Sequence, residues 1–246
     1  MKINKKLLDS LPSEFRNMGV SFKGDLPKEG QRSKEWHKIR EGRFTASTIS
    51  KIICKGSLTV GAKNYIAKKL WLDYYFEKPE QEEPLNNIYS GVYAIDRGID
   101  LEPEALDFYM KNTGIEMIES DFVKYGDFSG GSPDGKHVVD GGIKGICEIK
   151  CPEGYIHLNW GMLQNQSDLK SKDKQYFYQN MSNLLFTGAE WCDFISYHNK
   201  CKISKMFILR MLPDKEEFEI IKKAIKAATD FRNTIISTLE KKKKYL

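Results

Sequence analysis

The first regularly patterned part of the chain places its hydrophobic positions at helical spacing. Ser33 can cap a short helix that ends at Arg40, and Gly42 lies beyond that end. Thr45 can cap a second helix that carries three isoleucines at helical spacing, and residues 62–76 predict a third helix. This part of the chain is therefore expected to be helical.

A turn-rich linker with two prolines, residues 78–87, precedes a longer helical pattern. That pattern runs from residue 91 to residue 112 and closes at Gly114. Pro103 lies inside it and lacks the N–H group that a helix interior uses. We therefore expect a kink or a break close to Glu102.

The period of the pattern changes in the middle of the chain, where short runs separated by Gly, Asp and Pro turns predict strands. The predicted strands are residues 116–125, 136–140, 143–151, 191–198 and 203–210, and the later helices are residues 174–185 and 214–243. Helices flanking a central mixed sheet indicate a single α/β or α+β domain, and we predict the α/β class. The domain spans residues 31–246 and ends in a basic tail, after an irregular N-terminal segment at residues 1–30.

Composition narrows the class of protein. Of 246 residues, 40% are hydrophobic and 30% are charged, which excludes collagen-like and broadly disordered chains. No run approaches the roughly 18–20 apolar residues of a membrane span, and the basic start lacks the apolar stretch of a secretory signal. The five cysteines are an odd number without a CxxC pair. We therefore expect a cytoplasmic protein with reduced thiols and no membrane association.

Charge is distributed in blocks along the chain. Residues 31–70 hold ten Lys or Arg against two acids, whereas residues 71–110 hold ten acids against two bases. Such blocks suit a protein that attracts a polyanion and also holds cations. Two solvated helical faces explain the same pattern, and charge alone favours that interpretation.

Two stretches carry the candidate chemistry: Gly130-Gly-Ser-Pro-Asp-Gly135, which predicts a turn, and then Gly145-Ile-Cys-Glu-Ile-Lys-Cys-Pro152, which predicts a strand. Because side chains alternate along a strand, Glu148 and Lys150 share one face. On the surface such a pair contributes under about 1 kcal/mol. We expect residues 191–198 and 203–210 to neighbour this strand, however, and charges on a central strand need a reason.

A magnesium ion supplies such a reason, because Mg²⁺ prefers oxygen ligands and usually takes only one or two carboxylates. Asp134 from the turn and Glu148 from the strand can provide them, with the main-chain carbonyl of Ile149 as a further oxygen. Lys150, on the same face as Glu148, would then point toward water or phosphate. The residues themselves therefore predict a divalent-cation site at this turn and strand.

The order Asp…Glu-x-Lys is the signature of the PD-(D/E)XK nuclease superfamily, and five blocks of the sequence narrow the match. These blocks are Glu35-Trp-His-Lys-Ile-Arg40 with Thr45-Ala-Ser47, Leu101-Glu102-Pro103, Ser132-Pro-Asp-Gly135, Glu148-Ile-Lys-Cys-Pro152, and Tyr176-Phe-Tyr-Gln179 with Trp191-Cys-Asp-Phe194. In this order the chain resembles the phage lambda-type exonuclease family, also called YqaJ-like viral recombinases. The resemblance extends from about residue 34 to residue 197, and it implies a restriction-endonuclease-like core.

The resemblance also implies roles for individual residues. Asp134 and Glu148 would be metal ligands, together with the Ile149 carbonyl, and Lys150 would be the catalytic lysine that holds or helps to deprotonate the attacking water. Glu102 would complete the metal shell directly or through water, although without the other blocks a helix-surface acid is the better interpretation.

Further positions match the part of the family site that holds substrate. Gln179 would position the water or the scissile phosphate with Tyr176 beside it, whereas its alternative is a solvent-facing helix residue. Arg40 and Ser47 match positions that hold a terminal 5′ phosphate, which suits a guanidinium fork and a hydroxyl near a helix N-terminus. Trp36 is assigned no chemistry beyond packing.

The implied activity is 5′-to-3′ digestion of double-stranded DNA from 5′-phosphorylated ends. It would release 5′ mononucleotides, use one or two Mg²⁺ ions with Mn²⁺ as a possible substitute, and leave 3′ single strands for an annealing protein. The family further implies a homotrimeric ring and a phage- or prophage-encoded protein in a bacterial cytoplasm. Two alternatives stay open: a PD-(D/E)XK endonuclease, and a catalytically silent DNA-binding recombination protein, which the intact set of Asp134, Glu148 and Lys150 argues against.

Overall fold

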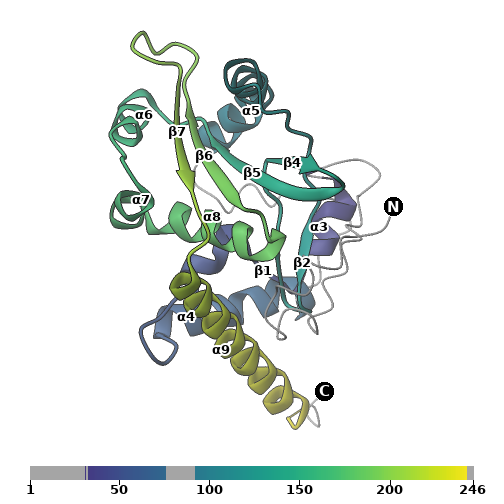
Figure 1. Ribbon diagram of the computed structural model, residues 1–246. Helices are drawn as coiled ribbons and strands as arrows, with labels where there is room; N and C mark the ends of the chain where they lie inside the picture. Colours follow the sequence, from purple (N-terminus) through teal and green to yellow (C-terminus); the bar gives the residue numbers. More distant parts are fainter. Residues whose placement is uncertain (1–30, 32, 76–91, 243–246) are drawn as a thin grey trace.

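A mixed four-stranded sheet lies at the centre of the structure, a computed structural model that describes residue 31 and residues 33–75 and 92–242 (Figure 1). Its strands, in spatial order, are β4 (Gly135–Val139), β5 (Gly142–Lys150), β6 (Trp191–Tyr197) and β7 (Met206–Met211). β5 pairs antiparallel with β4 and parallel with β6, and β6 pairs antiparallel with β7. β5 is therefore an interior strand, as predicted, although its neighbours are β4 and β6 and not β7.

Helices cover both faces of this sheet. α8 (Lys174–Thr187) packs on one face, where its Phe177 and Met181 join the core cluster of Phe194 from β6. α5 (Val92–Thr113) lies on the other face, where Tyr109 joins the cluster of Cys147 from β5. The parallel connection from β5 to β6 passes through α6 (Gly154–Gly161), α7 (Gln166–Lys172) and α8. The result is the predicted α/β single-domain architecture, with mixed sheets flanked by helices.

The side chains of β5 alternate between these two faces. Ile146 belongs to the cluster on the α8 side, whereas Cys147 and Ile149 belong to the cluster on the α5 side. Glu148 therefore faces α8, on the same side as Ile146. This confirms the predicted alternation along the strand, with Glu148 on the opposite face from Cys147 and Ile149.

A smaller sheet of three short strands lies beside the first. Its order is β1 (Phe44–Thr45), β3 (Ser129–Gly131) and β2 (Val123–Tyr125), with β1 parallel to β3. The chain enters β1 from α3 (Lys34–Arg40) and leaves it through the 3₁₀ helix η1 (Ala46–Lys51). The elements that complete this end are α4 (Val60–Leu70), the π-helical η2 (Trp71–Tyr75) and α9 (Lys215–Glu240).

Several predicted details are confirmed. The Ser33 hydroxyl caps α3 by accepting a 3.1 Å hydrogen bond from the N–H of Trp36. α5 is followed by Gly114, whose positive φ of 70° is the conformation that glycine favours at a helix end. α8, β6, β7 and α9 lie within a few residues of their predicted ranges.

Other details differ from the prediction. The segment after Thr45 is a 3₁₀ helix, and the Thr45 hydroxyl contacts the Ser47 and Thr48 hydroxyls without capping a main-chain N–H. α5 continues through Pro103 as one helix, so the expectation of a break at this point is wrong, whereas the kink that was the other expectation stays a prediction. The sequence pattern did not predict β1, β3, α6 or α7, and the strand predicted at residues 116–125 is reduced to β2 and an isolated bridge at Ile118. The predicted segments at residues 1–30 and 78–87 and the end of the lysine tail lie outside the described residues.

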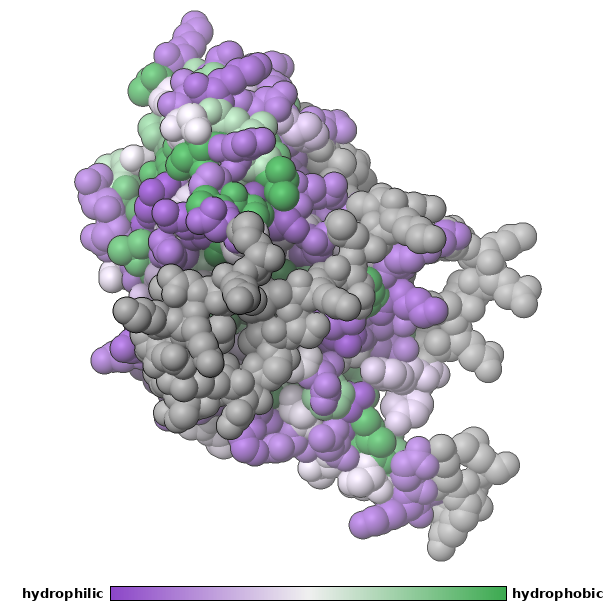
Figure 2. Space-filling model, turned by 45° about the vertical axis from the view of Figure 1, so that its right-hand side comes forward, coloured by the Kyte–Doolittle hydropathy of each residue, from purple (hydrophilic) through white to green (hydrophobic). Residues whose placement is uncertain are grey.

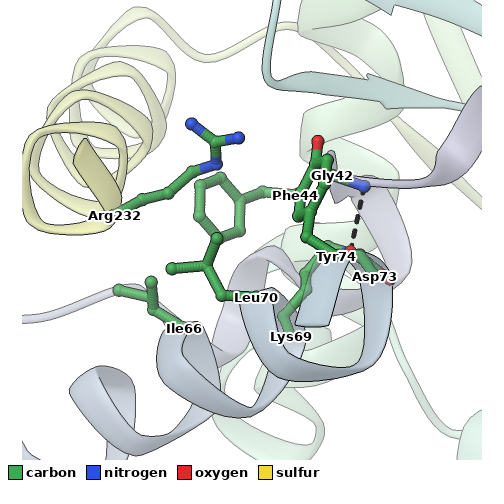
Figure 3. Close-up of a pocket in the computed structure, with 8 residues that line it drawn as sticks. All are labelled: Gly42, Phe44, Ile66, Lys69, Leu70, Asp73, Tyr74 and Arg232. Carbon is green, nitrogen blue, oxygen red and sulfur yellow. Dashed lines mark hydrogen bonds and ion pairs between the residues drawn. The ribbon is translucent and has the colours of Figure 1, made fainter. Parts of the chain in front are cut away.

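Within the described part of the chain, no helix combines the length and the hydrophobicity that a membrane span requires. Hydrophilic side chains make up most of the coloured face in Figure 2, with smaller apolar areas between them. A hollow of only about 10 Å³ lies where Arg232 of α9 approaches the Phe44, Leu70 and Tyr74 side chains (Figure 3). That hollow is too small for a ligand.

Candidate active site

An open cleft of about 210 Å³ lies beside the end of β5. It brings together eight of the nine residues that the sequence singles out, from α3, η1, α5, the turn before β4, β5 and α8. The cleft is lined by Gln31, Trp36, Arg40, Ala46, Ser47, Glu102, Ser132, Asp134, Glu148, Ile149, Lys150 and Gln179. Tyr176, the ninth residue, is not part of this lining, but its ring lies next to Lys150, with the ring centroid 5.4 Å from the lysine Nζ.

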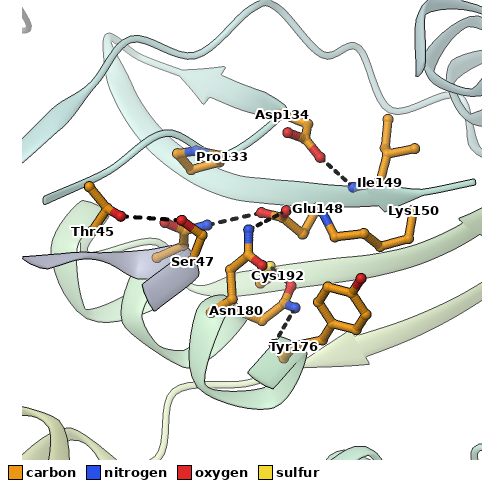
Figure 4. Close-up of polar contacts among 12 residues, drawn as sticks. Thr45, Ser47, Pro133, Asp134, Glu148, Ile149, Lys150, Tyr176, Asn180 and Cys192 are labelled. Atoms are coloured by element: carbon orange, nitrogen blue, oxygen red, sulfur yellow. Dashed lines mark hydrogen bonds and ion pairs between the residues drawn. The ribbon is translucent and has the colours of Figure 1, made fainter. Parts of the chain in front are cut away.

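Asp134 is fastened to β5 at two points. Its main-chain N–H donates a 3.0 Å hydrogen bond to the carbonyl of Cys147, and its Oδ2 accepts a 2.6 Å bond from the N–H of Ile149 (Figure 4). The turn that carries Asp134 thus continues the β4–β5 ladder past its last paired residue, Gly135. The carboxylate is held beside the strand that carries Glu148.

Glu148 is 1% exposed and accepts hydrogen bonds on both carboxylate oxygens. Its Oε1 accepts from Lys150 Nζ, in an ion pair, and from Gln179 Nε2. Its Oε2 accepts a 3.1 Å bond from Asn183 Nδ2. Gln179 is only 8% exposed, so its alternative interpretation as a solvent-facing residue is wrong.

The electrostatics of the site are those of two acids, the buried Glu148 and the half-buried Asp134, that share one ammonium group. Burial raises the pKa of Asp134 well above its usual value, and the negative charge of Glu148 raises it further. Burial also raises the pKa of Glu148, against the opposing effect of Lys150. For Lys150, burial lowers the pKa, but the carboxylates of Glu148 and Asp134 outweigh burial and hold it above the ordinary lysine value. Glu102 adds a third negative charge that raises the pKa of both acids. A bound cation would offset this excess of negative charge.

The donor atoms around Asp134 and Glu148 fit a hard divalent cation. Both residues offer carboxylate oxygens, which is the ligand type that Mg²⁺ prefers. The N–H and C=O of one strand residue point to the same side, so the carbonyl of Ile149 faces the side on which its N–H meets Asp134. Among the described residues, no three His, Cys, Asp or Glu side chains are grouped closely enough to hold a metal by themselves. A bound ion would therefore depend on main-chain carbonyl and water oxygens as well.

Arg40 occupies another part of the cleft lining. The guanidinium, on the last residue of α3, stacks on the Trp36 ring with its central carbon 3.9 Å from the ring centroid. The Trp36 Nε1–H in turn donates a 3.1 Å hydrogen bond to the Ser132 hydroxyl. Burial lowers the pKa of Arg40 to about 10 and Glu148 opposes that shift, so the group is charged at neutral pH. Arg40 is thus a fixed cation that is held in place by an aromatic ring.

Ser47 lies one residue into η1, where its hydroxyl is 3.2 Å from that of Thr45 (Figure 4). The predicted helix N-terminus beside Ser47 exists, but as a short 3₁₀ helix. Ser47 lines the same cleft as Arg40, so the structure brings together the two residues that match phosphate-binding positions.

Besides Trp36, sequence reasoning assigned no role to Gln31 and Ser132, which line this cleft, or to Asn183, which donates a hydrogen bond to Glu148. A signal was present for Trp36 and Asn183. Trp36 lies four residues before Arg40, and Asn183 lies four residues after Gln179, a spacing that places the side chains of each pair on one helix face. Gln31 had no such signal, because it joins the site through long-range bonds from its side-chain amide to the carbonyls of Ser120 and Pro133.

The fold and the cleft define the class of this protein. The YqaJ-like viral recombinase domain matches residues 35–190, which is more than half of the chain and includes every residue of the site discussed above except Gln31. The chain belongs to this family.

Solved structures support the same assignment. The chain is similar to the crystal structure of an alkaline exonuclease, LHK-Exo, from Laribacter hongkongensis, with a TM-score of 0.67 and 26% identity over 85% of this chain and 97% of that chain. A structure of LHK-Exo in complex with dAMP matches with a TM-score of 0.67, 25% identity and the same coverage. A phage-related exonuclease from Haemophilus somnus 129PT shares the fold, with a TM-score of 0.62 and 16% identity over 80% and 96% of the two chains. Comparison with curated proteins gave no match.

Proposed function

We propose that this chain is a divalent-metal-dependent exonuclease of the PD-(D/E)XK type. It would digest double-stranded DNA in the 5′-to-3′ direction from 5′-phosphorylated ends and release 5′ mononucleotides. The observation that carries the proposal is the convergence of Asp134, Glu148, Lys150 and Gln179 in one open cleft. Membership of the YqaJ-like family and the likeness to exonuclease structures support it. The complex of LHK-Exo with dAMP supports a mononucleotide product.

The cation site would be formed by the carboxylates of Asp134 and Glu148 and the carbonyl of Ile149, with Glu102 as a ligand directly or through water. One or two Mg²⁺ ions would bind, and Mn²⁺ would substitute. When bound, the ion supplies positive charge that stabilises the negative charge developing on the phosphate and on the leaving oxygen.

The chemical step is hydrolysis of the bond between phosphorus and the 3′ oxygen of the terminal nucleotide. A water molecule forms the new P–O bond and gives up a proton, and the leaving 3′ oxygen takes up a proton. Lys150, whose pKa the carboxylates of Glu148 and Asp134 hold above the ordinary lysine value, would hold the water or a phosphate oxygen as an ammonium group. Gln179, within reach of Glu148 Oε1, would orient the same water or the scissile phosphate, and the Tyr176 ring would keep the Lys150 ammonium in place.

Arg40 and Ser47 would bind the terminal 5′ phosphate. A guanidinium presents a fork of N–H donors that matches two phosphate oxygens, and the Ser47 hydroxyl adds a further donor. Stacking on Trp36 fixes the plane of that fork before the substrate arrives. Contacts to phosphate position a strand without reading its sequence, so digestion would show no base preference.

The cellular setting follows from the family resemblance. The 3′ single strands left by digestion would pass to a single-strand annealing protein for recombination. The chain would act as a homotrimeric ring in the cytoplasm of a bacterial host, encoded by a phage or prophage. A ring that encloses DNA would make digestion processive.

The proposal is tested by digestion of linear and covalently closed circular duplex DNA, with and without Mg²⁺ and with both kinds of 5′ terminus. We expect mononucleotides from linear DNA only, only with Mg²⁺, and faster from 5′-phosphorylated ends. Nicking of the closed circle would identify an endonuclease instead. Binding of DNA without release of nucleotides under any of these conditions would identify a catalytically silent protein.

A further inference from the structure

The Glu148 carboxylate is held at both of its oxygens by amides from one face of α8. Gln179 donates to Oε1, and Asn183, one helical turn later, donates to Oε2 at 3.1 Å. We propose that Asn183 is a positioning residue that orients Glu148 for cation binding, an inference that rests on the metal-dependent function proposed above. Nothing in the family resemblance assigned a role to this position.

The environment of Asn183 indicates that folding alone does not explain its presence. The residue is 1% exposed and lies among the core residues of α8, including Leu184 and Phe186. Its Oδ1 is buried and has no hydrogen-bond partner within the described part of the chain. A buried carbonyl without a partner is destabilising, and an apolar side chain would avoid that cost. The hydrogen bond to Glu148 is the interaction that an apolar residue would lose.

The orientation of the Asn183 amide is determined by its neighbours. Reversal of the amide would place Oδ1 against the Glu148 carboxylate, so two acceptors would face each other. β3 leaves room for Oδ1 because it has a glycine there: a Cβ on Gly131 would lie 2.2 Å from this atom. The amide nitrogen is therefore the group directed at Glu148.

The two carboxylate oxygens of Glu148 accept different numbers of hydrogen bonds. Oε1 accepts from both Lys150 and Gln179, whereas among the described residues the hydrogen bond to Oε2 comes from Asn183. With donors at both ends the carboxylate is restrained from rotating about its last bond. Groups that fix the direction of a metal ligand typically contribute 10- to 100-fold to metal affinity or activity.

The test measures binding of Mg²⁺ alone, without DNA, by isothermal titration calorimetry of the full-length chain and of Asn183→Ala. The rise in unfolding temperature caused by Mg²⁺ is a second readout of cation binding. Asn183→Ser, whose hydroxyl is one bond short of the amide nitrogen, is a second variant with a smaller cavity. Ser182→Ala is the matched control, because Ser182 is buried on the same helix and its hydroxyl has no partner among the described residues.

We expect Asn183→Ala and Asn183→Ser to bind Mg²⁺ 10- to 100-fold more weakly and to show a smaller Mg²⁺-induced rise in unfolding temperature. Ser182→Ala should match the unmodified chain in both measurements. A lower unfolding temperature without Mg²⁺, combined with unchanged Mg²⁺ affinity, would show that Asn183 is only structural and would overturn the inference. If the unmodified chain binds no Mg²⁺, the proposed function itself fails.

Discussion

Asp134 and Ile149 lie fifteen positions apart in the sequence and are joined by a 2.6 Å hydrogen bond from the Ile149 N–H to Asp134 Oδ2. This bond connects the turn that carries Asp134 to the strand that carries Glu148. The two acids of the candidate site are thus parts of one rigid unit, and neither depends on a loop that must close over the substrate.

Asp134→Asn should lower the rate of nucleotide release by about 10²-fold or more. The amide oxygen can still accept the bond from Ile149, so the fold is kept, whereas the negative charge for the cation is lost. The measurement is the release of acid-soluble nucleotide from linear duplex with Mg²⁺. Asp230→Asn, at an exposed position on α9 paired with Lys226, is the control and should digest normally. Near-normal digestion by Asp134→Asn would remove this residue from the site.

Lys150→Ala should cause a rate loss of similar size, about 10²-fold or more, because it removes the ammonium that faces the cleft. It also leaves Glu148 without its ion-pair partner, so the unfolding temperature should be recorded for each preparation. Lys222→Ala breaks an ion pair on α9 that lies outside the cleft, and it should leave the rate unchanged. Equal rates for the Lys150 and Lys222 variants would contradict a catalytic role for Lys150.

Arg40→Ala should slow digestion of 5′-phosphorylated ends more than digestion of 5′-hydroxyl ends, because only the former can bind the guanidinium fork. The measurement is the ratio of the two initial rates, together with the affinity for duplex DNA. Lys38→Ala removes the same charge from an exposed position on the same helix, and it should keep the ratio of the unmodified chain. An equal loss on both substrates would argue against a phosphate pocket at Arg40.

Tyr109→Phe should lower the free energy of unfolding by about 1.5 kcal/mol, the lower end of the range for a hydrogen bond to a charged group. The Tyr109 hydroxyl donates a 2.6 Å bond to Asp193, which stays paired with Arg210 in the variant. Chemical denaturation measures the change. Tyr155→Phe, at a residue that is 65% exposed, should change stability by less than about 0.5 kcal/mol. Equal stabilities of the two variants would show that the buried Tyr109–Asp193 bond contributes nothing.

Analytical ultracentrifugation at working protein concentration should show a trimer, as expected for a ring. With a trimer, digestion should also be processive, because DNA threaded through a ring cannot leave readily. The matching measurement is the length of DNA digested in the presence of an excess of competitor DNA. Sedimentation as a monomer only would exclude the ring.

Much of the fold was predictable from local pattern. Ser33 and Gly114 mark helix ends because capping depends on the residue itself and its immediate neighbours. The continuation of α5 through Pro103 was not predictable, because local preference disfavours a proline inside a helix and only the whole structure shows that the helix tolerates it here. β3 was also missed, since Ser129–Gly131 carries no hydrophobic alternation and is a strand only through pairing with β1 and β2.

The sequence by itself determined the alternation that places Glu148 and Lys150 on one face, and the order of motifs that identifies the family. Both are properties of the chain's own periodicity and spacing. Only the tertiary structure decided that Asn183 donates to Glu148, that the Trp36 ring stacks on Arg40, and that Gln31 lines the cleft. These contacts join segments far apart in the chain or set the direction of a side chain, and both depend on how helices and strands pack and not on local sequence.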